Sequence, residues 1–306
     1  MVVELEELEE LEDSSFLAQP LKIISVNRTG IIVSFEIFIT SFMREGYSSN
    51  LLEQSHQKLI KNYLSRNTYF NGLLIFHGTG TGKTCSSITI AETYKNLISL
   101  NSKKILVILS KSVKSNFIKE IHNVGKGYNQ CTGSDYLNYD IFSSQEKRKK
   151  NVLSLIDKFY DLMTYGKFKN EISKQLDMYG IDKYQFSQQI PDDLIKWIDL
   201  RYSDRVIIVD EVHNLKNYKG DEEIDEMMDK SEIESEQTST RKLKRYDALE
   251  LILKYSRNVK LILLSATPMY HKPVEIISIF NLLLLNDDYD RIEATNIFDG
   301  NSLTEY

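Results

Sequence analysis

The stretch LLIFHGTGTGKT, residues 73–84, decides the fold of this chain. Its first four residues, Leu73 to Phe76, are large and apolar, and a glycine-rich turn follows them at once. A short, wholly apolar run of this kind is typical of a strand that is buried on both faces of a parallel sheet. The segment therefore predicts a buried strand that leads through a tight turn into a helix.

The turn has the residue types of a phosphate-binding loop. Glycines let backbone N–H groups turn inward around the phosphates, and the positive N-terminus of the following helix adds to the attraction. Lys83 supplies a cation, and the Thr84 hydroxyl is a ligand for Mg²⁺. The loop departs from the strict G-x-x-x-x-G-K-[ST] pattern because His77 replaces the first glycine. The expected nucleotide-binding residues are Gly78, Thr79, Gly80, Thr81, Gly82, Lys83 and Thr84.

Similar apolar runs recur at residues 105–109, 206–209 and 261–264, separated by segments long enough for helical crossovers. Strands that alternate with helices predict an α/β fold with a mostly parallel, doubly wound sheet and helices on both faces. Upstream, residues 21–42 are rich in Ile, Val, Phe and Thr and are interrupted by a turn at residues 27–30. That pattern predicts two further strands.

The second chemical signal is RVIIVDEVH, residues 205–213, in which an apolar run ends in two adjacent carboxylates. A strand that ends in Asp210 places this carboxylate near the phosphate loop, where it can hold Mg²⁺ together with Thr84. Glu211 then lies where it can orient or deprotonate an attacking water. Lys83, Asp210 and Glu211 are therefore the predicted catalytic residues. His213 is expected to sense the γ-phosphate or to contact the third motif, and a purely structural histidine is the alternative.

The third signal is SATP, residues 265–268, directly after the apolar run at 261–264. Small hydroxyl residues at the carboxyl edge of a sheet can hydrogen-bond the side chains of the Asp-Glu-x-His segment and so report the state of the nucleotide. Ser265, Ala266 and Thr267, together with His213, are therefore the predicted coupling residues.

The chain has a net charge of −6, and its acidic and basic residues are distributed unevenly along the sequence. Residues 1–50 hold three basic and nine acidic side chains, and residues 221–236 hold one basic and nine acidic. The rest of the chain is basic, and residues 101–150 hold ten basic against four acidic side chains. A basic body is compatible with a polyanionic partner, although a solvated face of mixed charge accounts for the lysines equally well.

Several features of the sequence bear on where the protein is located, and none of them predicts a membrane span. The apolar runs are far shorter than the roughly 18 to 20 residues that cross a bilayer, and the acidic start MVVELEELEELED is unlike a basic leader. The two cysteines, Cys85 and Cys131, lack metal-ligand spacing and suggest a reducing compartment. The expected location is the cytoplasm or nucleus, or a virion if the protein is viral.

Together, HGTGTGKT (77–84), DEVH (210–213) and SAT (265–267) strongly resemble motifs I, II and III of the first motor lobe of superfamily 2 helicases and translocases. The resemblance implies a RecA-like P-loop NTPase lobe that binds ATP and Mg²⁺ and couples ATP hydrolysis to nucleic acid. The strings DEVHNLKN and SATPMYHKPVEIISIFNLLL look like helicase-like ATPases of large double-stranded DNA viruses, including the small subunit of the poxvirus early transcription factor. Viral transcription machinery is therefore an implied partner.

Two further segments extend the resemblance. Residues 109–121 look like motif Ia of the Swi2/Snf2 branch, and residues 162–168 look like motif Ib. Both motifs contact the nucleic-acid backbone in that family, which would account for the basic excess in residues 101–150. The resemblance therefore implies a nucleic-acid partner, and DNA is expected ahead of RNA. The residues that the resemblance assigns to this contact are Lys111, Ser112, Lys114, Thr164 and Tyr165. Gln57 sits where the family carries an adenine-reading glutamine, and a helix-surface glutamine is the simpler alternative.

These signals divide the chain into an acidic segment with a β extension (1–48), a RecA-like domain (49–290) and a C-terminal tail (291–306). Within the domain, residues 220–247 are dominated by Asp, Glu, Ser and Lys and are expected to form a mobile acidic insertion. The insertion could mimic DNA or dock a basic partner, and a solvated loop is the simpler alternative.

Residues after Thr267 contain no second lobe with a Q-x-x-G-R-x-x-R string. In such motors the second lobe supplies an arginine, and arginines of this kind are worth on the order of 10³–10⁵ in rate in related P-loop enzymes. We therefore expect weak turnover by this lobe alone, and a second lobe from a longer chain or another subunit to complete the site.

Two other functions are alternatives to a motor lobe. One is a catalytically quiet transcription-factor subunit that uses ATP only as a conformational latch. A P-loop nucleotide kinase or small GTPase is disfavoured, because DEVH and SAT have no role in those enzymes.

Overall fold

The computed structural model describes residues 21–26, 32–37, 60–65, 68–76, 82–122, 131–132, 136, 145–181, 190–215, 243–268, 275–293, 295, 297–299 and 302–303. The acidic start MVVELEELEELED, residues 77–81 of the glycine-rich turn and residues 220–242 of the acidic insertion lie outside this description.

A seven-stranded sheet with the order β2-β1-β3-β7-β6-β4-β5 forms the centre of the molecule. The strands are β1 (Leu21–Val26), β2 (Ile32–Ile37), β3 (Gly72–Phe76), β4 (Ile105–Leu109), β5 (Tyr160–Thr164), β6 (Val206–Val209) and β7 (Lys260–Ser265). Five of them, β3-β7-β6-β4-β5, pair in parallel, while β1 and β2 add an antiparallel hairpin at the edge beside β3. The expected α/β fold with a mostly parallel sheet is confirmed.

Successive residues of the central strands point alternately into two separate cores. In β4, Leu106 and Ile108 join one buried cluster, whereas Ile105, Val107 and Leu109 join the other. Because both faces are covered, every residue of such a strand must be apolar, which explains the unbroken runs in the sequence.

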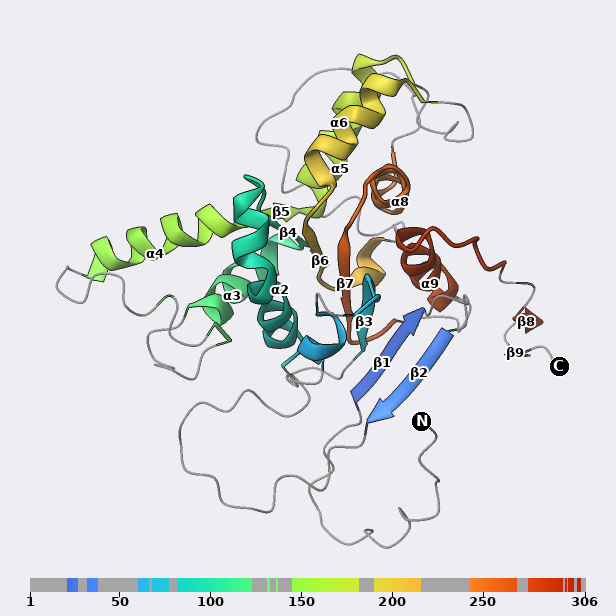
Figure 1. The fold of residues 1–306 in the computed structure, drawn as a ribbon, viewed down its shortest axis with the longest axis horizontal. Helices are drawn as coiled ribbons and strands as arrows, with labels where there is room; N and C mark the ends of the chain where they lie inside the picture. The colour runs from blue at the N-terminus through green and yellow to red at the C-terminus, as the bar shows by residue number, and fades with distance from the viewer. Residues whose placement is uncertain are drawn as a thin grey trace, which may run out of the picture.

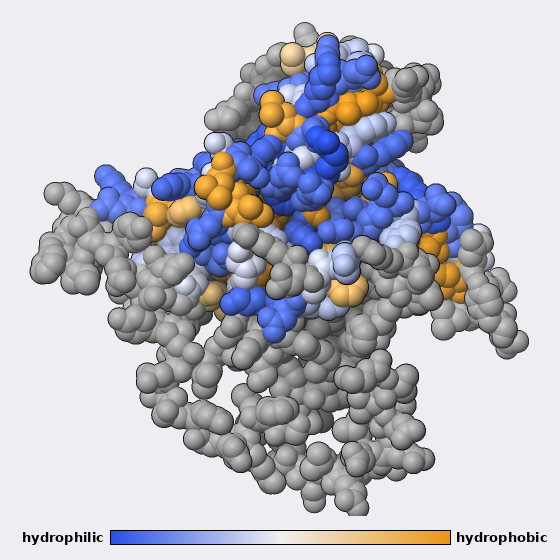
Figure 2. Space-filling model, viewed as in Figure 1, coloured by the Kyte–Doolittle hydropathy of each residue, from blue (hydrophilic) through white to orange (hydrophobic). Residues whose placement is uncertain are grey.

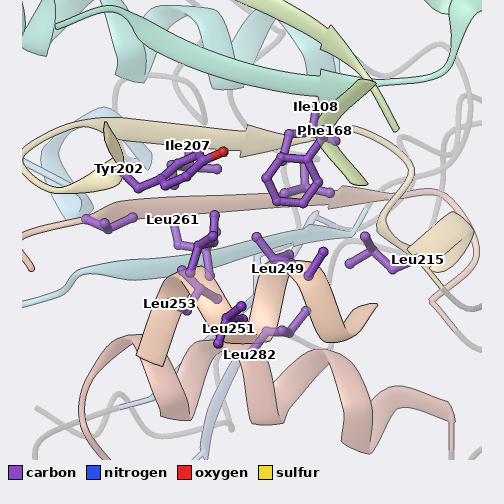
Figure 3. Close-up of a cluster of buried hydrophobic side chains, with 14 of the residues drawn as sticks. Ile108, Phe168, Tyr202, Ile207, Leu215, Leu249, Leu251, Leu253, Leu261 and Leu282 are labelled. Atoms are coloured by element: carbon purple, nitrogen blue, oxygen red, sulfur yellow. The ribbon is translucent and has the colours of Figure 1, made fainter. Parts of the chain in front are cut away.

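Helices cover both faces of the sheet (Figure 1). One face carries α2 (Lys83–Leu100), α3 (Lys111–Ile121) and α4 (Gln145–Phe159). The other carries α5 (Tyr165–Met178), α6 (Asp192–Tyr202), α8 (Arg245–Tyr255) and α9 (Glu275–Asn286). Figure 3 shows leucines of α8, including Leu249 and Leu253, facing Ile207 and Leu261 of the sheet.

The outer surface contrasts with these cores. Among the residues that Figure 2 colours, most are hydrophilic, and the apolar ones lie in small separate groups. Large apolar side chains that are exposed include Leu100, Met178 and Leu200. In the described part of the chain, no helix combines the length and apolar character needed to cross a membrane.

Strand β5 was not expected as a strand, because its sequence YDLMT mixes polar and apolar residues. It lies at the edge of the sheet and pairs only with β4 among the described strands, so most of its residues remain half-buried. Partial burial removes the need for a wholly apolar run, and this is why the pattern did not reveal it.

The acidic insertion is shorter at its C-terminal end than its composition suggests. Leu243 is buried, and Arg245 begins α8 with only 7% of its surface exposed. Residues 243–247, assigned to the mobile insertion from their composition, therefore belong to the packed domain. Three buried apolar residues anchor this end of the segment: Leu243, Ala248 and Leu249. Composition averaged over a window cannot separate them from the polar residues just before them.

Cys85 and Cys131 form a disulfide across 46 residues of sequence. The bond ties the first turn of α2 to the segment that follows α3. It counts against the reducing compartment that the cysteines suggested, because disulfides are rare there. Their spacing in the sequence could not reveal the contact, since only the fold brings the two residues together.

Reduction of this disulfide is expected to destabilise the chain. A closed loop of this length restricts the unfolded state, so cleavage by dithiothreitol should lower the free energy of unfolding by about 2–4 kcal/mol. Urea unfolding with and without reductant measures the change, and the Cys85→Ser, Cys131→Ser double variant should show no response to reductant. Equal stability of the oxidised and reduced chain would contradict the expectation.

Gly72 illustrates how closely α9 packs on the sheet. A Cβ at this position would lie 2.8 Å from Cδ2 of Leu283, which is fully buried. We predict that Gly72→Ala lowers the free energy of unfolding by about 1–3 kcal/mol, the usual cost of overpacking. The double variant Gly72→Ala, Leu283→Val should lose less free energy of unfolding than the sum of the losses in the two single variants, because the shorter valine side chain makes room for the new methyl group. Additive losses in urea unfolding would show that the two positions do not compete for space.

Candidate nucleotide-binding and hydrolysis site

The topology brings the three motifs to one edge of the sheet. Strand β7 lies between β3 and β6, and all three run parallel. Phe76 at the end of β3 pairs with Ser265 at the end of β7, and the next strand ends at Val209. The glycine-rich turn, SAT and DEVH therefore leave the same edge, the usual place for ligands in open α/β sheets.

The start of α2 has the features of an anion-binding helix terminus. Gly82 has a φ of +85°, a left-handed conformation that favours glycine, and it forms the N-cap of the helix. Lys83 and Thr84 follow in the first turn, and Lys83 is buried. A helix N-terminus with free backbone N–H groups and a nearby cation is a ready-made anion site.

Asp210 is a buried carboxylate at the end of β6, with 4% of its surface exposed. Its backbone N–H donates to the carbonyl of Ile108 (2.9 Å), which continues the ladder between β6 and β4 past the end of the strand. Burial, with a smaller contribution from Glu211, raises the pKa of Asp210 to about 6, and the positive charge of Lys83 opposes this rise. Asp210 and Lys83 are thus close enough to interact electrostatically.

Glu211 and His213 connect DEVH to SAT. The backbone N–H of Ala266 donates to Oε2 of Glu211 (3.4 Å), and Nδ1 of His213 lies 3.5 Å from the same oxygen. Nδ1 of His213 also lies 3.1 Å from Oγ of Ser265. That hydroxyl accepts a hydrogen bond from the backbone N–H of Thr267 (3.1 Å). The structure therefore joins all four predicted coupling residues to one network that includes the predicted base.

The donor set fits Mg²⁺ bound together with a nucleotide. Mg²⁺ in such sites is held by one or two protein oxygens and by the substrate phosphates, and keeps several waters. Among the described residues, no group of three or more His, Cys, Asp or Glu side chains could hold a metal ion. Burial raises the pKa of Asp210, and a bound cation would favour the charged form of this carboxyl group. Asp210 and the Thr84 hydroxyl would hold the ion, which would neutralise charge on the phosphates.

Five of the predicted nucleotide-binding residues lie outside the described part of the chain: Gln57, Gly78, Thr79, Gly80 and Thr81. Their roles stay predictions.

The residues assigned to nucleic-acid contact differ in exposure and in the groups that their side chains bind. Lys111 and Ser112 are exposed at the start of α3. Nζ of Lys114 donates to the carbonyl of Leu162 in β5 (3.1 Å), so this lysine links the two segments. Oγ1 of Thr164 accepts from the backbone N–H of Lys167 (3.2 Å) and caps α5.

Tyr165 does not lie where a phosphate could reach its side chain. It is 3% exposed, and its hydroxyl donates to the carbonyls of Asp210 (2.6 Å) and Glu211 (3.1 Å). Burial raises the pKa of Tyr165 well above its ordinary value, so the hydroxyl keeps its proton. The motif resemblance assigned Tyr165 to nucleic-acid contact, whereas its side chain points to the DEVH turn.

Arg245 is a site residue that the sequence did not reveal. Its Nη1 donates to the carbonyl of Asn214 (3.2 Å), and its guanidinium lies 5.6 Å from the centre of the Tyr165 ring. It is the last residue of the basic stretch RKLKR, residues 241–245, and no local pattern distinguishes it from the other basic residues there.

Comparison with known proteins agrees with this geometry. Residues 50–270 match the family described as "Type III restriction enzyme, res subunit" (ResIII). The chain belongs to this family. ResIII is a P-loop helicase domain, and its match begins before the glycine-rich turn and ends after SAT.

Viral proteins are among the relatives of this ResIII domain. "Putative helicase 087L" of Invertebrate iridescent virus 3 is 33% identical over 241 residues, which cover 75% of this chain and 20% of that protein. "Putative ATP-dependent RNA helicase L377" of Acanthamoeba polyphaga mimivirus is 27% identical over 267 residues, covering 80% of this chain and 20% of that protein. "Putative ATP-dependent RNA helicase R563" of the same virus is 27% identical over 238 residues, covering 76% and 33%. The chain thus spans between a fifth and a third of the length of these relatives.

Replacement of Asp210 tests the electrostatics of the metal-free site. The pKa of Asp210 rises on folding from its ordinary value near 4 to about 6. Its contribution to the free energy of unfolding is therefore fully present below about pH 4 and is lost as the pH rises through about 6. Asp210→Asn should therefore raise the free energy of unfolding by about 1–3 kcal/mol at pH 8 without Mg²⁺. Urea unfolding at pH 8 and pH 5 measures the gain, which should shrink at the lower pH. A loss of stability at pH 8, or a gain that does not change with pH, would contradict this assignment.

Proposed function

We propose that this chain is the first RecA-like motor lobe of a superfamily 2 helicase or translocase, which binds ATP with Mg²⁺ and hydrolyses it in response to nucleic acid. The observation that carries the proposal is the convergence of Lys83, Asp210 and the network of Glu211 at one edge of the sheet. Membership of a helicase family and the helicase names of its relatives support it.

In this proposal each side chain has a distinct task. Lys83 and the backbone N–H groups at the start of α2 hold the phosphates, while Thr84 and Asp210 hold the ion that neutralises them. Glu211 orients or deprotonates the attacking water. His213, Ser265 and Thr267 then pass the state of the site to the surfaces that contact nucleic acid.

DNA is the substrate we propose, because the segments around α3 and β5 resemble those of the Swi2/Snf2 branch and the relatives come from large DNA viruses. RNA is the second candidate, because two mimivirus relatives are named as RNA helicases. A role in viral transcription and a second lobe in the same or another polypeptide complete the proposal. Of the expected locations, a virion is the one in which the disulfide between Cys85 and Cys131 would persist.

ATP hydrolysis at low salt, with double-stranded DNA, with RNA and with neither, tests the function. Lys83→Ala should weaken ATP binding at least about 10-fold, because it removes the cation at the phosphates. Glu211→Gln should leave ATP binding within about 2-fold but lower turnover about 10²–10⁴-fold, the usual contribution of a general base. Lys196→Ala, at an exposed salt bridge on α6, is a control that should change neither.

The outcomes of this assay separate the candidates. Turnover stimulated by DNA or RNA and lost in both variants supports a motor and identifies its substrate. ATP binding without turnover, together with nucleotide-dependent DNA affinity that persists in Glu211→Gln, would favour the conformational latch. Absence of ATP binding by the unsubstituted chain would refute the proposal.

A further inference from the structure

The DEVH turn contains a conformation that needs support. Glu211 has a φ of +55°, in the left-handed region, which costs a residue with a Cβ roughly 1–2 kcal/mol. A non-glycine residue keeps such a conformation only when its surroundings hold it there. Groups around Glu211 must therefore hold this residue and, with it, the neighbouring Asp210.

Backbone contacts hold only part of the turn. The N–H of Asp210 donates to the carbonyl of Ile108, and the N–H of Asn214 donates to the carbonyl of Glu211 (2.9 Å). These bonds fix the entry into the turn and the start of the 3₁₀ helix η3 (Val212–Leu215) that follows it. Neither of these two bonds involves the carbonyl of Asp210, in the middle of the turn.

Tyr165 supplies a donor to this carbonyl from a different part of the chain. Its hydroxyl lies 2.6 Å from the carbonyl of Asp210 and 3.1 Å from that of Glu211, so one side chain holds both peptide groups. Tyr165 is buried, and its ring is covered by the guanidinium of Arg245. Arg245 also binds the carbonyl of Asn214, so side chains of α5 and α8 together bind backbone carbonyls at Asp210, Glu211 and Asn214.

The position of Tyr165 in the chain adds a second connection. It is the first residue of α5 and follows Thr164, whose side chain caps this helix. Thr164 and the neighbouring Lys114 belong to the segments that we assign to nucleic-acid contact. The same tyrosine therefore joins the start of that helix to the turn that carries Asp210 and Glu211.

We propose that Tyr165 is a positioning residue that holds the Asp210–Glu211 turn in the geometry needed for Mg²⁺-dependent binding of ATP, and that it links this turn to the start of α5. The inference rests on the proposed function, because it assigns a task to Tyr165 within that same site. Tyr165 itself touches neither the nucleotide nor the metal in this account. Its effect passes through the two carbonyls that it binds.

Tyr165→Phe tests the inference, because it removes the hydroxyl and keeps the ring that packs in the core. The matched control is Tyr202→Phe, which removes another buried hydroxyl in the same core cluster. The hydroxyl of Tyr202 donates to Glu171 (3.0 Å), and Tyr202 lies at the opposite end of the cluster from Leu215 of η3 (Figure 3). A general loosening of the core would therefore affect both variants alike.

The readout is the affinity of the 306-residue chain for N-methylanthraniloyl-ATP, measured by fluorescence with Mg²⁺ and with EDTA. The ratio of the two dissociation constants is the gain in affinity from Mg²⁺. We expect Tyr165→Phe to lower this gain roughly 3- to 10-fold, the range for one hydrogen bond, while affinity in EDTA stays within about 2-fold. Tyr202→Phe should keep the gain of the unsubstituted chain.

Each other outcome counts against the inference in a distinct way. If the unsubstituted chain binds with a gain from Mg²⁺ and Tyr165→Phe keeps that gain, the positioning role is refuted while the proposed function stands. If both tyrosine variants lose the gain equally, the effect is a general one and the specific role is refuted. If the unsubstituted chain shows no gain from Mg²⁺, the proposed function and this inference fall together.

Discussion

The parallel alignment of β3, β7 and β6 is the constraint on which the site depends. Because these strands run in one direction and lie side by side, their carboxyl ends meet at one edge, and residues far apart in sequence become neighbours. The middle strand, β7, ends at Ser265, whose hydroxyl lies near His213 of the DEVH segment that follows β6. Any change in the strand order would separate these groups.

A buried carboxylate at this edge is costly, and the surrounding structure shows how the cost is reduced. Asp210 is kept ionisable by the charge of Lys83 and by a hydrogen bond from the backbone N–H of Glu211, yet burial still raises its pKa to about 6. Structural stability alone gives no reason to retain such a group. A cation bound with a phosphate ligand would balance the charge, which is why perturbed carboxyl groups of this kind mark functional sites.

Much of the fold and part of the site could be predicted from the sequence for a physical reason. Strands buried on both faces must be apolar throughout, so β3, β4, β6 and β7 were readable as short runs, and the polar residues directly after them marked the site edge. The edge strand β5, half-buried, carried no such run. The same reasoning pointed to Ser265, which is the last residue of β7, and to His213, which follows the two carboxylates after β6.

The parts that could not be predicted depend on contacts between distant segments. The hydroxyl of Tyr165 meets the DEVH turn across 45 residues, and Arg245 meets Asn214 across 31. The disulfide between Cys85 and Cys131 spans 46. None of these pairs has a local spacing that signals contact, so a motif resemblance could place Tyr165 in its segment but could not say which way its side chain points.

The central claim is that Lys83, Thr84 and Asp210 form one site for ATP and Mg²⁺ at the edge of the sheet. A crystal structure of the chain with Mg²⁺ and a non-hydrolysable ATP analogue tests it most directly. The account predicts phosphates over the N-terminus of α2 in contact with Lys83. It also predicts a metal about 2.0–2.1 Å from the Thr84 hydroxyl, with the Asp210 carboxylate bound to it directly or through water. A nucleotide bound elsewhere, or a metal that contacts neither Thr84 nor Asp210, would contradict the account.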